Sequence, residues 1–501
     1  MSLKKIAILG TGASSFSSAL SFFESKIHNF QIDVIDFGDN PNEIKDLNST
    51  PVETLKSNHK NASVLKVDPL LELKSEVKNL PVGTSSFGGW AEMWGATISP
   101  FREEDIRNWP IDIDSLLPHQ ARIKSELTFA KTSDWAMEEK NAKSRIKSGL
   151  QDFVNSIKIS KNPSNFEYTN SVLAINNFAE SPEKGCIQCE RCLSGCEYDQ
   201  IWIPSIGWKK IFTDPRFTYK KNYWIETITE SFDGVKLCAK TRKGDSLEIG
   251  SYEYVFVGLG SIQTGALLLR SKLTKNVVLK ENRIYTIPFV ISGFKRTGSA
   301  QKRVSLSDLF MRIKSVSTVI DLDFFAQLYG HNSQIQERIV QSSKVLQKFP
   351  GILVGVVLKR MGIAMFFLDE KISNEISLIL NEGRVETKEI IYTDFPIKKI
   401  RMMIKAALKT AKLFPFFFLA HLGKTGESYH LGSSFPMTSN PISSNHSDMY
   451  GRPNGMKRVS VVDSSIFTTL PATPLTFNMM ANAHRISTYI IENVLNENPY
   501  K

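Results

Sequence analysis

The chain begins with a segment that strongly restricts its fold: KIAILGTGASSFSSAL, residues 5–20. An apolar run leads directly into Gly10, Thr11 and Gly12 and then into small residues, which is typical of a buried strand, a tight turn and a helix. In nucleotide-binding units of this kind, the first glycine allows the turn and the second lets a pyrophosphate approach the backbone. The helix that opens at Ala13 directs its N–H groups at the phosphates. The segment therefore predicts an α/β fold with a Rossmann-like domain.

A second strand and an acidic residue follow at the spacing that a dinucleotide site requires. Residues 31–36, QIDVID, are typical of a buried strand. They end in Asp36, about 20 residues beyond the turn, where a carboxylate accepts a hydrogen bond from a ribose hydroxyl. Ser15 replaces the third glycine of the usual motif, which weakens the match. The spacing favours a dinucleotide site, and a purely structural glycine turn is the alternative.

The same N-terminal residues have the basic start, apolar run and small residues of a secretory signal. We favour the strand and helix because Asp36 follows at the expected distance. No uninterrupted apolar stretch reaches the ~18–20 residues that span a bilayer. The nearest, residues 351–368, contains Lys359 and Arg360. We therefore expect a cytoplasmic protein.

Length and charge limit the organisation of the chain and its partners. Its 501 residues exceed the ~250–300 at which one core stops growing, so we expect more than one domain. The formal net charge of +11 suits an anionic membrane, an anionic substrate or a nucleic acid. No nucleic-acid-binding motif is present and the lysines are scattered, as on solvated faces. We therefore expect no nucleic acid partner.

Three further segments carry glycines or an acid at characteristic places. Residues 85–101, SSFGGWAEMWGATISPF, place Gly88-Gly89 shortly before Trp94-Gly95. Residues 254–271 are typical of a strand, a glycine turn and a helix, and residues 459–487 of a strand, a loop and a final helix. In this order the segments resemble the glucose–methanol–choline family of FAD-dependent oxidoreductases. The resemblance covers the N-terminal third, the 254–271 block and the C-terminal end of the chain.

The resemblance implies a division into two domains. An FAD-binding domain would comprise residues 1–285 and 425–501 and include the cysteine run described below. A substrate domain of antiparallel sheet and helices would comprise residues 286–424, where little of the sequence matches the family.

The resemblance also implies which residues bind FAD. The 254–271 block departs from the family signature at Gly265, where proline is usual, and just beyond its end at Lys272, where glycine is usual. No histidine lies in residues 85–99, so we expect non-covalent FAD. The implied residues are Gly10, Gly12, Ala13 and Asp36 for the ADP half; Gly88, Gly89, Trp94, Gly95 and Ala96 for the isoalloxazine and pyrophosphate; Gly260 in the second signature; and Asp463 and Ser464 for the ribityl chain.

A catalytic base is expected near the flavin. The segment 426–437, GESYHLGSSFPM, is similar to the family's His-x-x-Gly-Thr segment but one residue shorter. Oxidation of an alcohol needs a group that takes its proton near neutrality, and His430 is the candidate; a histidine that only satisfies loop carbonyls is the alternative. The family's second His or Asn is absent from residues 470–474, where Thr473 is the remaining polar candidate, able to donate a hydrogen bond but not to act as a base.

Four of the five cysteines lie within residues 186–196, in the run CIQCERCLSGC. This C-x2-C-x2-C-x3-C spacing occurs in bacterial ferredoxins, whose fourth cysteine ligates a different cluster from the first three. An iron–sulfur cluster is our preferred interpretation, with zinc and a metal-free structural segment as alternatives. A cluster would accept electrons singly from reduced flavin, as in a dehydrogenase. The candidate ligands are Cys186, Cys189, Cys192 and Cys196.

Residues 398–413, KKIRMMIKAALKTAKL, predict a basic amphipathic helix. Our first interpretation is a surface helix that packs on the sheet of the substrate domain. The alternative is peripheral membrane contact through residues 398–420, which would suit a phosphorylated or lipid-linked substrate.

Together these patterns predict a dehydrogenase that oxidises an alcohol group, on a sugar or polyol, by hydride transfer to FAD. Its electrons would pass through the cluster to an unidentified acceptor. The alternative is a flavin and iron–sulfur electron-transfer or membrane-docked protein without its own alcohol substrate.

Overall fold

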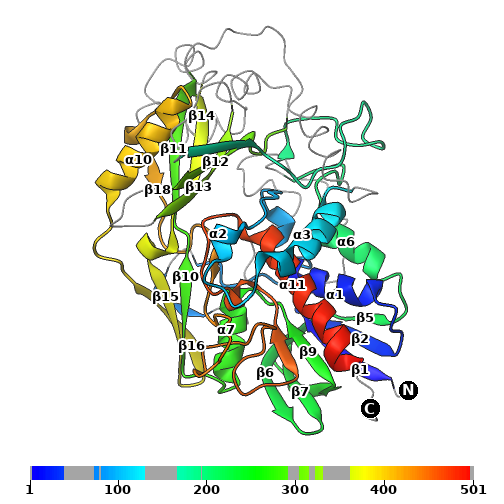
Figure 1. Cartoon of the computed structure of the whole chain (residues 1–501). Coiled ribbons are helices and arrows are strands. Elements are labelled where there is room, and N and C mark those ends of the chain that lie inside the picture. The colour runs from blue at the N-terminus through cyan, green and yellow to red at the C-terminus, as the bar shows by residue number, and fades with distance from the viewer. Residues whose placement is uncertain are drawn as a thin grey trace.

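The computed structural model describes residues 3–38, 73–77, 80–129, 166–192, 195–291, 304–314, 322–330 and 361–496 (Figure 1). Its first core surrounds a parallel sheet in the order β20-β9-β1-β2-β5. Segments from both ends of the chain therefore lie side by side in one sheet. The strands are β1 (Lys4–Leu9), β2 (Phe30–Ile35), β5 (Phe217–Lys220), β9 (Tyr254–Val257) and β20 (Val459–Val461).

Both faces of the parallel sheet are covered, which explains why β9 and β20 are buried at every position. Helix α1 (Ala13–Glu24) packs against the last long helix, α11 (Leu475–Tyr489), which also contacts α3 (Ile113–Leu127). On the other side, an antiparallel meander contacts β1 and β9. Its strands are β6 (Tyr223–Ser231), β7 (Gly234–Thr241) and β8 (Ser246–Tyr252).

A larger, antiparallel sheet has its own hydrophobic core. Helix α10 (Ile397–Thr410) packs on it through the buried side chains of Ile400, Ile404, Ala407 and Leu408. The strands, in sheet order, are β17 (Leu413–Pro415), β11 (Ile284–Ile291), β14 (Met361–Phe367), β13 (Asp323–Tyr329), β12 (Leu309–Lys314) and β4 (Phe166–Asn170), and β18 (His421–Leu422) pairs with β11.

A third sheet lies between the other two in Figure 1, with helix α7 (Ser261–Arg270) against it. Its strands are β19 (Leu431–Gly432), β10 (Asn276–Glu281), β15 (Glu375–Asn381), β16 (Arg384–Ile390) and β3 (Lys74–Ser75). The other helices among the described residues are α2 (Glu103–Ile106) and α6 (Pro204–Ile211). Short 3₁₀ segments lie at Gly89–Met93, Glu370–Ile372, Phe417–Leu419 and Ser464–Ile466, and α11 continues into a π-helical segment, Ile490–Leu495.

This architecture confirms the predicted α/β fold with a second, antiparallel sheet. The domain boundaries stay a prediction; strand β4, at Phe166–Asn170, pairs with β12 in the larger sheet although it precedes residue 285. In the described parts of the chain, no helix combines the length and hydropathy needed to cross a bilayer.

Candidate active site

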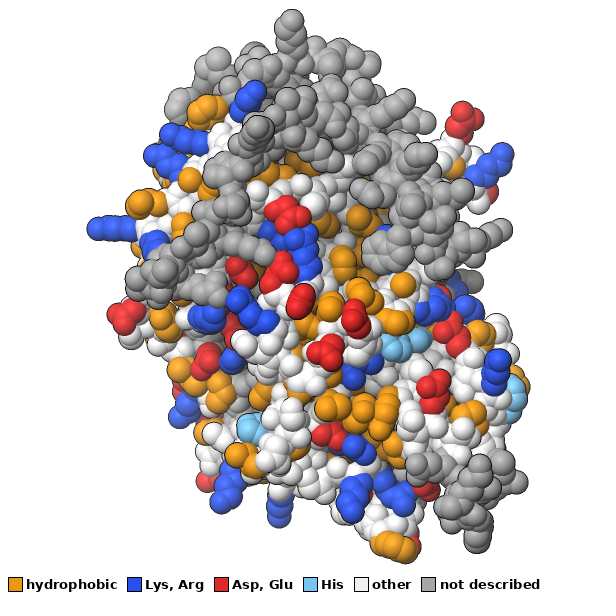
Figure 2. Space-filling view, in the orientation of Figure 1, with side chains coloured by type: hydrophobic (Ala, Val, Ile, Leu, Met, Phe, Trp, Pro, Cys, Tyr) orange, Lys and Arg blue, Asp and Glu red, His pale blue; other side chains and the backbone are white. Residues whose placement is uncertain are grey.

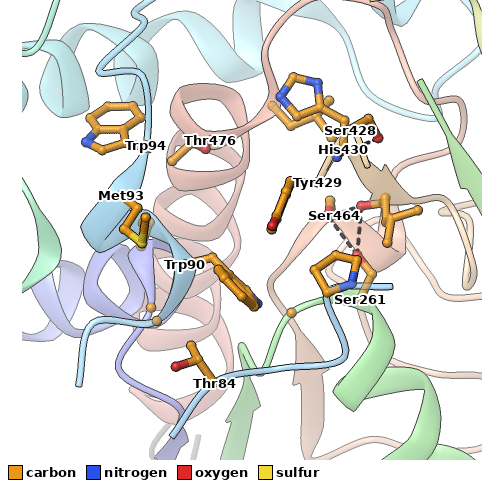
Figure 3. Close-up of a pocket in the computed structure, with 18 of the residues that line it drawn as sticks. Thr84, Trp90, Met93, Trp94, Ser261, Ser428, Tyr429, His430, Ser464 and Thr476 are labelled. Carbon is orange, nitrogen blue, oxygen red and sulfur yellow. Dashed lines mark hydrogen bonds between the residues drawn. The ribbon is translucent and has the colours of Figure 1, made fainter. Parts of the chain in front are cut away.

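A cavity of about 790 Å³ lies between the parallel sheet and the larger antiparallel sheet. This volume is within the ~300–1,000 Å³ typical of ligand sites. Its walls come from the glycine turn after β1, the 81–97 segment, the start of α7, the 427–431 segment and the start of α11. Figure 3 shows Trp90, Thr476 and His430, from three of these walls, around the same space. Most of the predicted cofactor residues therefore share one cavity with the predicted base.

The glycine turn is built for close backbone approach. Gly10 has φ +90°, and a Cβ there would lie 2.7 Å from the carbonyl oxygen of Gly258, so only glycine fits without displacement. Gly12 caps α1 with no side chain in the way. Gly10, Gly12 and Ala13 all line the cavity. The turn thus leaves the first N–H groups of a buried helix facing the cavity, as phosphate binding requires.

Ser15, in the place of the third glycine, has a structural function. Its hydroxyl is fully buried and lies 2.9 Å from the carbonyl oxygen of Leu9 and 3.1 Å from that of Gly258. It therefore ties the start of α1 to β1 and β9. A Cβ at Gly258 would lie 2.2 Å from the Ser15 hydroxyl, so the close contact between helix and sheet is made possible by Gly258.

Asp36 lies at the end of β2 and faces the cavity, as predicted. It accepts hydrogen bonds from the Thr11 hydroxyl and from the backbone N–H of Phe37. Burial raises the pKa of Asp36 to about 6, because the carboxylate is poorly solvated there, although both hydrogen bonds oppose the shift. Thr11 also accepts a hydrogen bond from the Gly88 N–H at 2.9 Å. Thr11 thus connects the Asp36 carboxylate to the 85–101 segment, a contact that its place between two glycines did not reveal.

The 85–101 segment contributes Gly89, Trp94 and Gly95 to the cavity wall. The indole N–H of Trp94 donates to the Trp202 carbonyl at 2.8 Å, which fixes the ring. The other two predicted residues, Gly88 and Ala96, do not line the cavity. Ala96 is fully buried, and its carbonyl accepts from the Ala174 N–H at 2.8 Å. Its small size and φ of +52° shape the loop behind the wall.

Gly260, Asp463 and Ser464 meet at the opposite end of the cavity. Gly260 caps α7, and the next residue, Ser261, hydrogen-bonds to the Ser464 hydroxyl at 2.8 Å. Asp463 accepts from the Thr264 hydroxyl at 2.5 Å, and burial raises its pKa. The second glycine turn and the strand end before α11 are therefore joined into one rigid wall.

His430 lies in this cavity immediately before β19. Its ring stacks on Phe367, with centroids 4.2 Å and planes 9° apart. Its Nδ1 atom is buried and has no hydrogen-bond partner in the described part of the chain. Burial lowers the pKa of His430 to about 4, because the imidazolium would lose its hydration. The ring is therefore neutral at pH 7 and able to accept a proton.

Thr473 is buried and is not among the residues that line the cavity. The structure therefore does not bring this predicted donor to the site. Thr476, one turn later, does line the cavity, and Figure 3 shows it across from His430. Asn478 is fully buried and donates to the Ser99 carbonyl at 2.8 Å, so it supports the wall rather than facing the cavity.

A polar chain on the larger sheet was not found from the sequence. Tyr329 donates to the Gln327 side-chain oxygen at 2.5 Å, and the Gln327 amide donates to the Thr97 hydroxyl at 3.0 Å. All three side chains line the cavity beside apolar residues such as Met365 and Ile363. This wall offers hydrogen-bonding groups on an otherwise apolar surface, as for recognition of a hydroxylated molecule.

The cysteine run lies close behind the Trp94 wall, and Cys192 itself lines the cavity. Backbone N–H groups point at two sulfurs: Gln188 N–H at Cys186 Sγ (3.4 Å) and Gln200 N–H at Cys196 Sγ (3.3 Å). Burial raises the pKa of the Cys192 thiol to about 12. All five cysteines are free thiols. Within the described residues, which omit 193–194, no group of three or more His, Cys, Asp or Glu side chains is arranged to hold a metal ion. The thiol geometry therefore does not by itself support the predicted cluster.

The walls of the cavity fit a dinucleotide better than a small metabolite alone. The glycine turn, Asp36 and the two helix starts supply groups for phosphates and ribose along one side. Trp90 Nε1, like His430 Nδ1, is buried in the cavity without a hydrogen-bond partner in the described part of the chain. Such orphaned polar atoms are rare in folded proteins and are expected where a ligand supplies the partner.

Of the comparisons with known proteins, the one with solved structures gives a match. No protein-family model matches the sequence, and no curated protein matches it. Among solved structures, the chain is similar to pyridoxine 4-oxidase from Mesorbium loti, with a TM-score of 0.54 over 97% of this chain and 98% of that chain. The sequence identity is 11%, so the likeness shows the fold alone. It supports the α/β fold that the sequence resemblance implied.

Proposed function

We propose, from this shared fold and the cavity, that the protein is an FAD-dependent oxidoreductase acting on the CH–OH group of a small molecule. The observation that carries the proposal is that a dinucleotide-type glycine turn and a neutral, buried histidine open into one cavity. Neither feature alone would indicate an enzyme, because glycine turns and buried histidines both occur in structural sites.

The residues that would hold FAD follow from the cavity walls. Gly10, Gly12 and Asp36 would bind the ADP half, and Asp463 with Ser464 the ribityl chain. Trp94 and Gly95 would lie along the isoalloxazine. When bound, the flavin supplies the acceptor for the hydride that leaves the alcohol carbon.

His430 would accept the hydroxyl proton of the alcohol. Its low pKa keeps the ring in the base form at pH 7, and Nδ1, which has no hydrogen-bond partner among the described residues, is available for the proton. The stacked Phe367 ring restricts its rotation, so the base is oriented before substrate binds. The Tyr329–Gln327–Thr97 chain would orient a hydroxylated substrate, for which a sugar or polyol is our preferred class.

Anaerobic mixing with a panel of sugars, polyols and simple alcohols tests this function. We expect the flavin absorbance of the holoenzyme to bleach with at least one alcohol and not with its deoxy analogue. Bound FAD that no alcohol bleaches would favour the alternative, an electron-transfer protein without its own substrate.

We also propose that the cysteine run holds an iron–sulfur cluster that receives the electrons. Its support is the ferredoxin spacing, the N–H groups directed at Cys186 and Cys196, and the place of Cys192 on the cavity wall. A cluster next to the cofactor cavity would make the enzyme a dehydrogenase. Iron and acid-labile sulfide in anaerobically purified protein are the direct measure.

A further inference from the structure

Helix α10 carries two different surfaces. Its apolar side is already used, because Ile400, Ile404, Ala407 and Leu408 are fully buried against the larger sheet. The helix therefore cannot lie with that side in a membrane, as an isolated amphipathic helix would. Any further function of α10 must use its opposite side and the segment that follows it.

The opposite side combines exposed lysines with exposed large hydrophobic residues. Lys398, Met402, Lys405 and Lys409 follow one another at spacings of four, three and four, so they share one stripe of the helix. The Met402 side chain is 71% exposed. Beyond the helix, Phe414 is 49% and Phe418 75% exposed. We call Lys398, Met402, Lys405, Lys409, Lys412, Phe414 and Phe418 the α10 surface; Figure 2 shows Lys, Arg and hydrophobic side chains together where α10 lies in Figure 1.

The charge of this surface is of one sign. Residues 397–420 contain six lysines and arginines and no aspartate or glutamate. Arg401 is exposed but has partners within the protein: it donates to the Tyr285 hydroxyl at 2.9 Å and lies over the Phe417 ring. The lysines of the α10 surface form no ion pair in the described part of the chain, unlike lysines such as Lys240 on the meander, which pairs with Glu226. A solvated face normally mixes both signs, so this one is complementary to an anionic partner.

The surface borders the entrance of the cavity. Phe418 is followed by Leu419, which lines the cavity, and by His421, which lines it and is 64% exposed at the side chain. The chain thus passes from an exposed aromatic residue to the cavity mouth within three residues. A partner seated on the α10 surface would lie next to the route by which substrate enters.

We propose that the α10 surface docks the protein on an anionic lipid bilayer. Lysines near a negatively charged membrane contribute about 1 kcal/mol each. Exposed aromatic and Met side chains insert at the boundary between headgroups and acyl chains. Protein–protein interfaces are depleted in lysine, and the chain has no nucleic-acid-binding motif, so exposed lysines together with exposed Met402, Phe414 and Phe418 favour a bilayer. The inference is independent of the reaction and stands or falls separately from the proposed function.

Co-sedimentation of the full-length holoprotein with vesicles tests the docking. The probes are vesicles of phosphatidylcholine alone and of phosphatidylcholine with an equal part of phosphatidylglycerol. We expect binding to the anionic vesicles only. Lys405→Glu with Lys409→Glu should weaken it at least about ten-fold, since two charges change sign, and Phe414→Ser with Phe418→Ser should weaken it at unchanged charge.

Two matched variants control for general effects. Phe232→Ser removes a phenylalanine that is 94% exposed on the meander, and Lys275→Glu reverses an exposed charge outside α10; both should bind like wild type. Equal thermal unfolding of all variants excludes misfolding.

Two results overturn the proposal directly. One is that the wild-type protein does not sediment with anionic vesicles; the other is that the control variants lose as much vesicle binding as the α10 variants. The proposal is also overturned if the glutamate variants lose both vesicle binding and oligonucleotide binding while the serine variants keep vesicle binding. That result would assign the surface to a polyanion.

Discussion

The imidazole of His430 lies flat on the ring of Phe367, with centroids 4.2 Å apart and planes 9° apart. The two residues come from different elements, the segment before β19 and the end of β14, so the contact joins two sheets at the cavity. Stacking on an apolar ring withholds water from one face of the histidine, and burial keeps its pKa near 4. The pair therefore explains how a base stays unprotonated and oriented.

Replacement of His430 should remove most of the catalysis. His430→Ala should slow flavin reduction by an alcohol about 10²- to 10⁴-fold, the usual effect of losing a general base. FAD content should be unchanged, because the cofactor contacts lie elsewhere. His28→Ala, outside the cavity, is the control. Stopped-flow reduction rates within a few-fold of wild type would remove His430 from the reaction.

The pH profile provides an independent measure of His430. Because its pKa is lowered to about 4, the base form persists well below the ordinary histidine range. The second-order rate constant for flavin reduction should therefore stay constant from about pH 8 to about pH 5 and decline only near pH 4. An inflection near the ordinary value of about 6.5 would show that a solvated histidine or another group is the base.

The sequence predicted the glycine turn, Asp36 and His430 because each depends on local pattern. Apolar strands, glycines and an acid at fixed spacing specify one turn whatever the rest of the chain does. Thr473 does not line the cavity, whereas Thr476, at the start of α11, does. Residue types alone do not show at which residue the last helix begins, so they could not decide whether Thr473 or Thr476 faces the cavity.

The Tyr329–Gln327–Thr97 chain could not be predicted because its members meet only in the folded protein. Gln327 and Thr97 are 230 positions apart. The pairing of β4 with β12 is equally remote. Alternation along β13 predicts which residues share a face but not which strand or loop they meet. The polar chain on this wall therefore could be found only from the folded structure, whereas Gly10, Asp36 and His430 could be named from local sequence patterns.

Asp36 should limit the stability of the FAD-free protein. Its pKa is raised from 3.8 to about 6, so the folded apoprotein binds its proton more tightly than the unfolded chain. The free energy of unfolding of the apoprotein should then fall by up to about 3 kcal/mol as pH rises from about 4 to about 6. It should stay level above pH 6. Asp36→Asn should abolish this step and raise apoprotein stability at pH 7 while weakening FAD binding. Urea unfolding across pH and FAD titration measure the two effects; an unchanged pH dependence would contradict the assignment.

Gly10 and Gly244 form a matched pair for testing the turn. Both have φ of +90°, but a Cβ at Gly10 would meet the Gly258 carbonyl oxygen at 2.7 Å, whereas a Cβ at Gly244 meets nothing within 4 Å. Gly244→Ala should cost about 1–2 kcal/mol, the backbone penalty alone. Gly10→Ala should cost clearly more and lose FAD. Equal unfolding free energies for both variants would mean that the turn relaxes and that the close approach is not required.

The cysteine run can be tested ligand by ligand. If it holds a cluster, serine at Cys186, Cys189 or Cys192 should each remove iron and acid-labile sulfide and the broad absorption that thiolate-bound clusters add beneath the flavin bands. Cys238→Ser is the matched control, because Cys238 lies on β7, in the meander, and should keep full iron.

Cys196 distinguishes the two ligand schemes. If it closes the same cluster, Cys196→Ser should change the paramagnetic spectrum of the reduced protein; if three thiolates suffice, it should not. In either case alcohol should still bleach the flavin of the serine variants, while turnover with one-electron acceptors falls, because the cysteines act after the alcohol is oxidised. Metal analysis without iron, or full iron in the Cys192 variant, would make the run a structural segment. The high pKa of Cys192 would then report only a buried thiol beside the cavity.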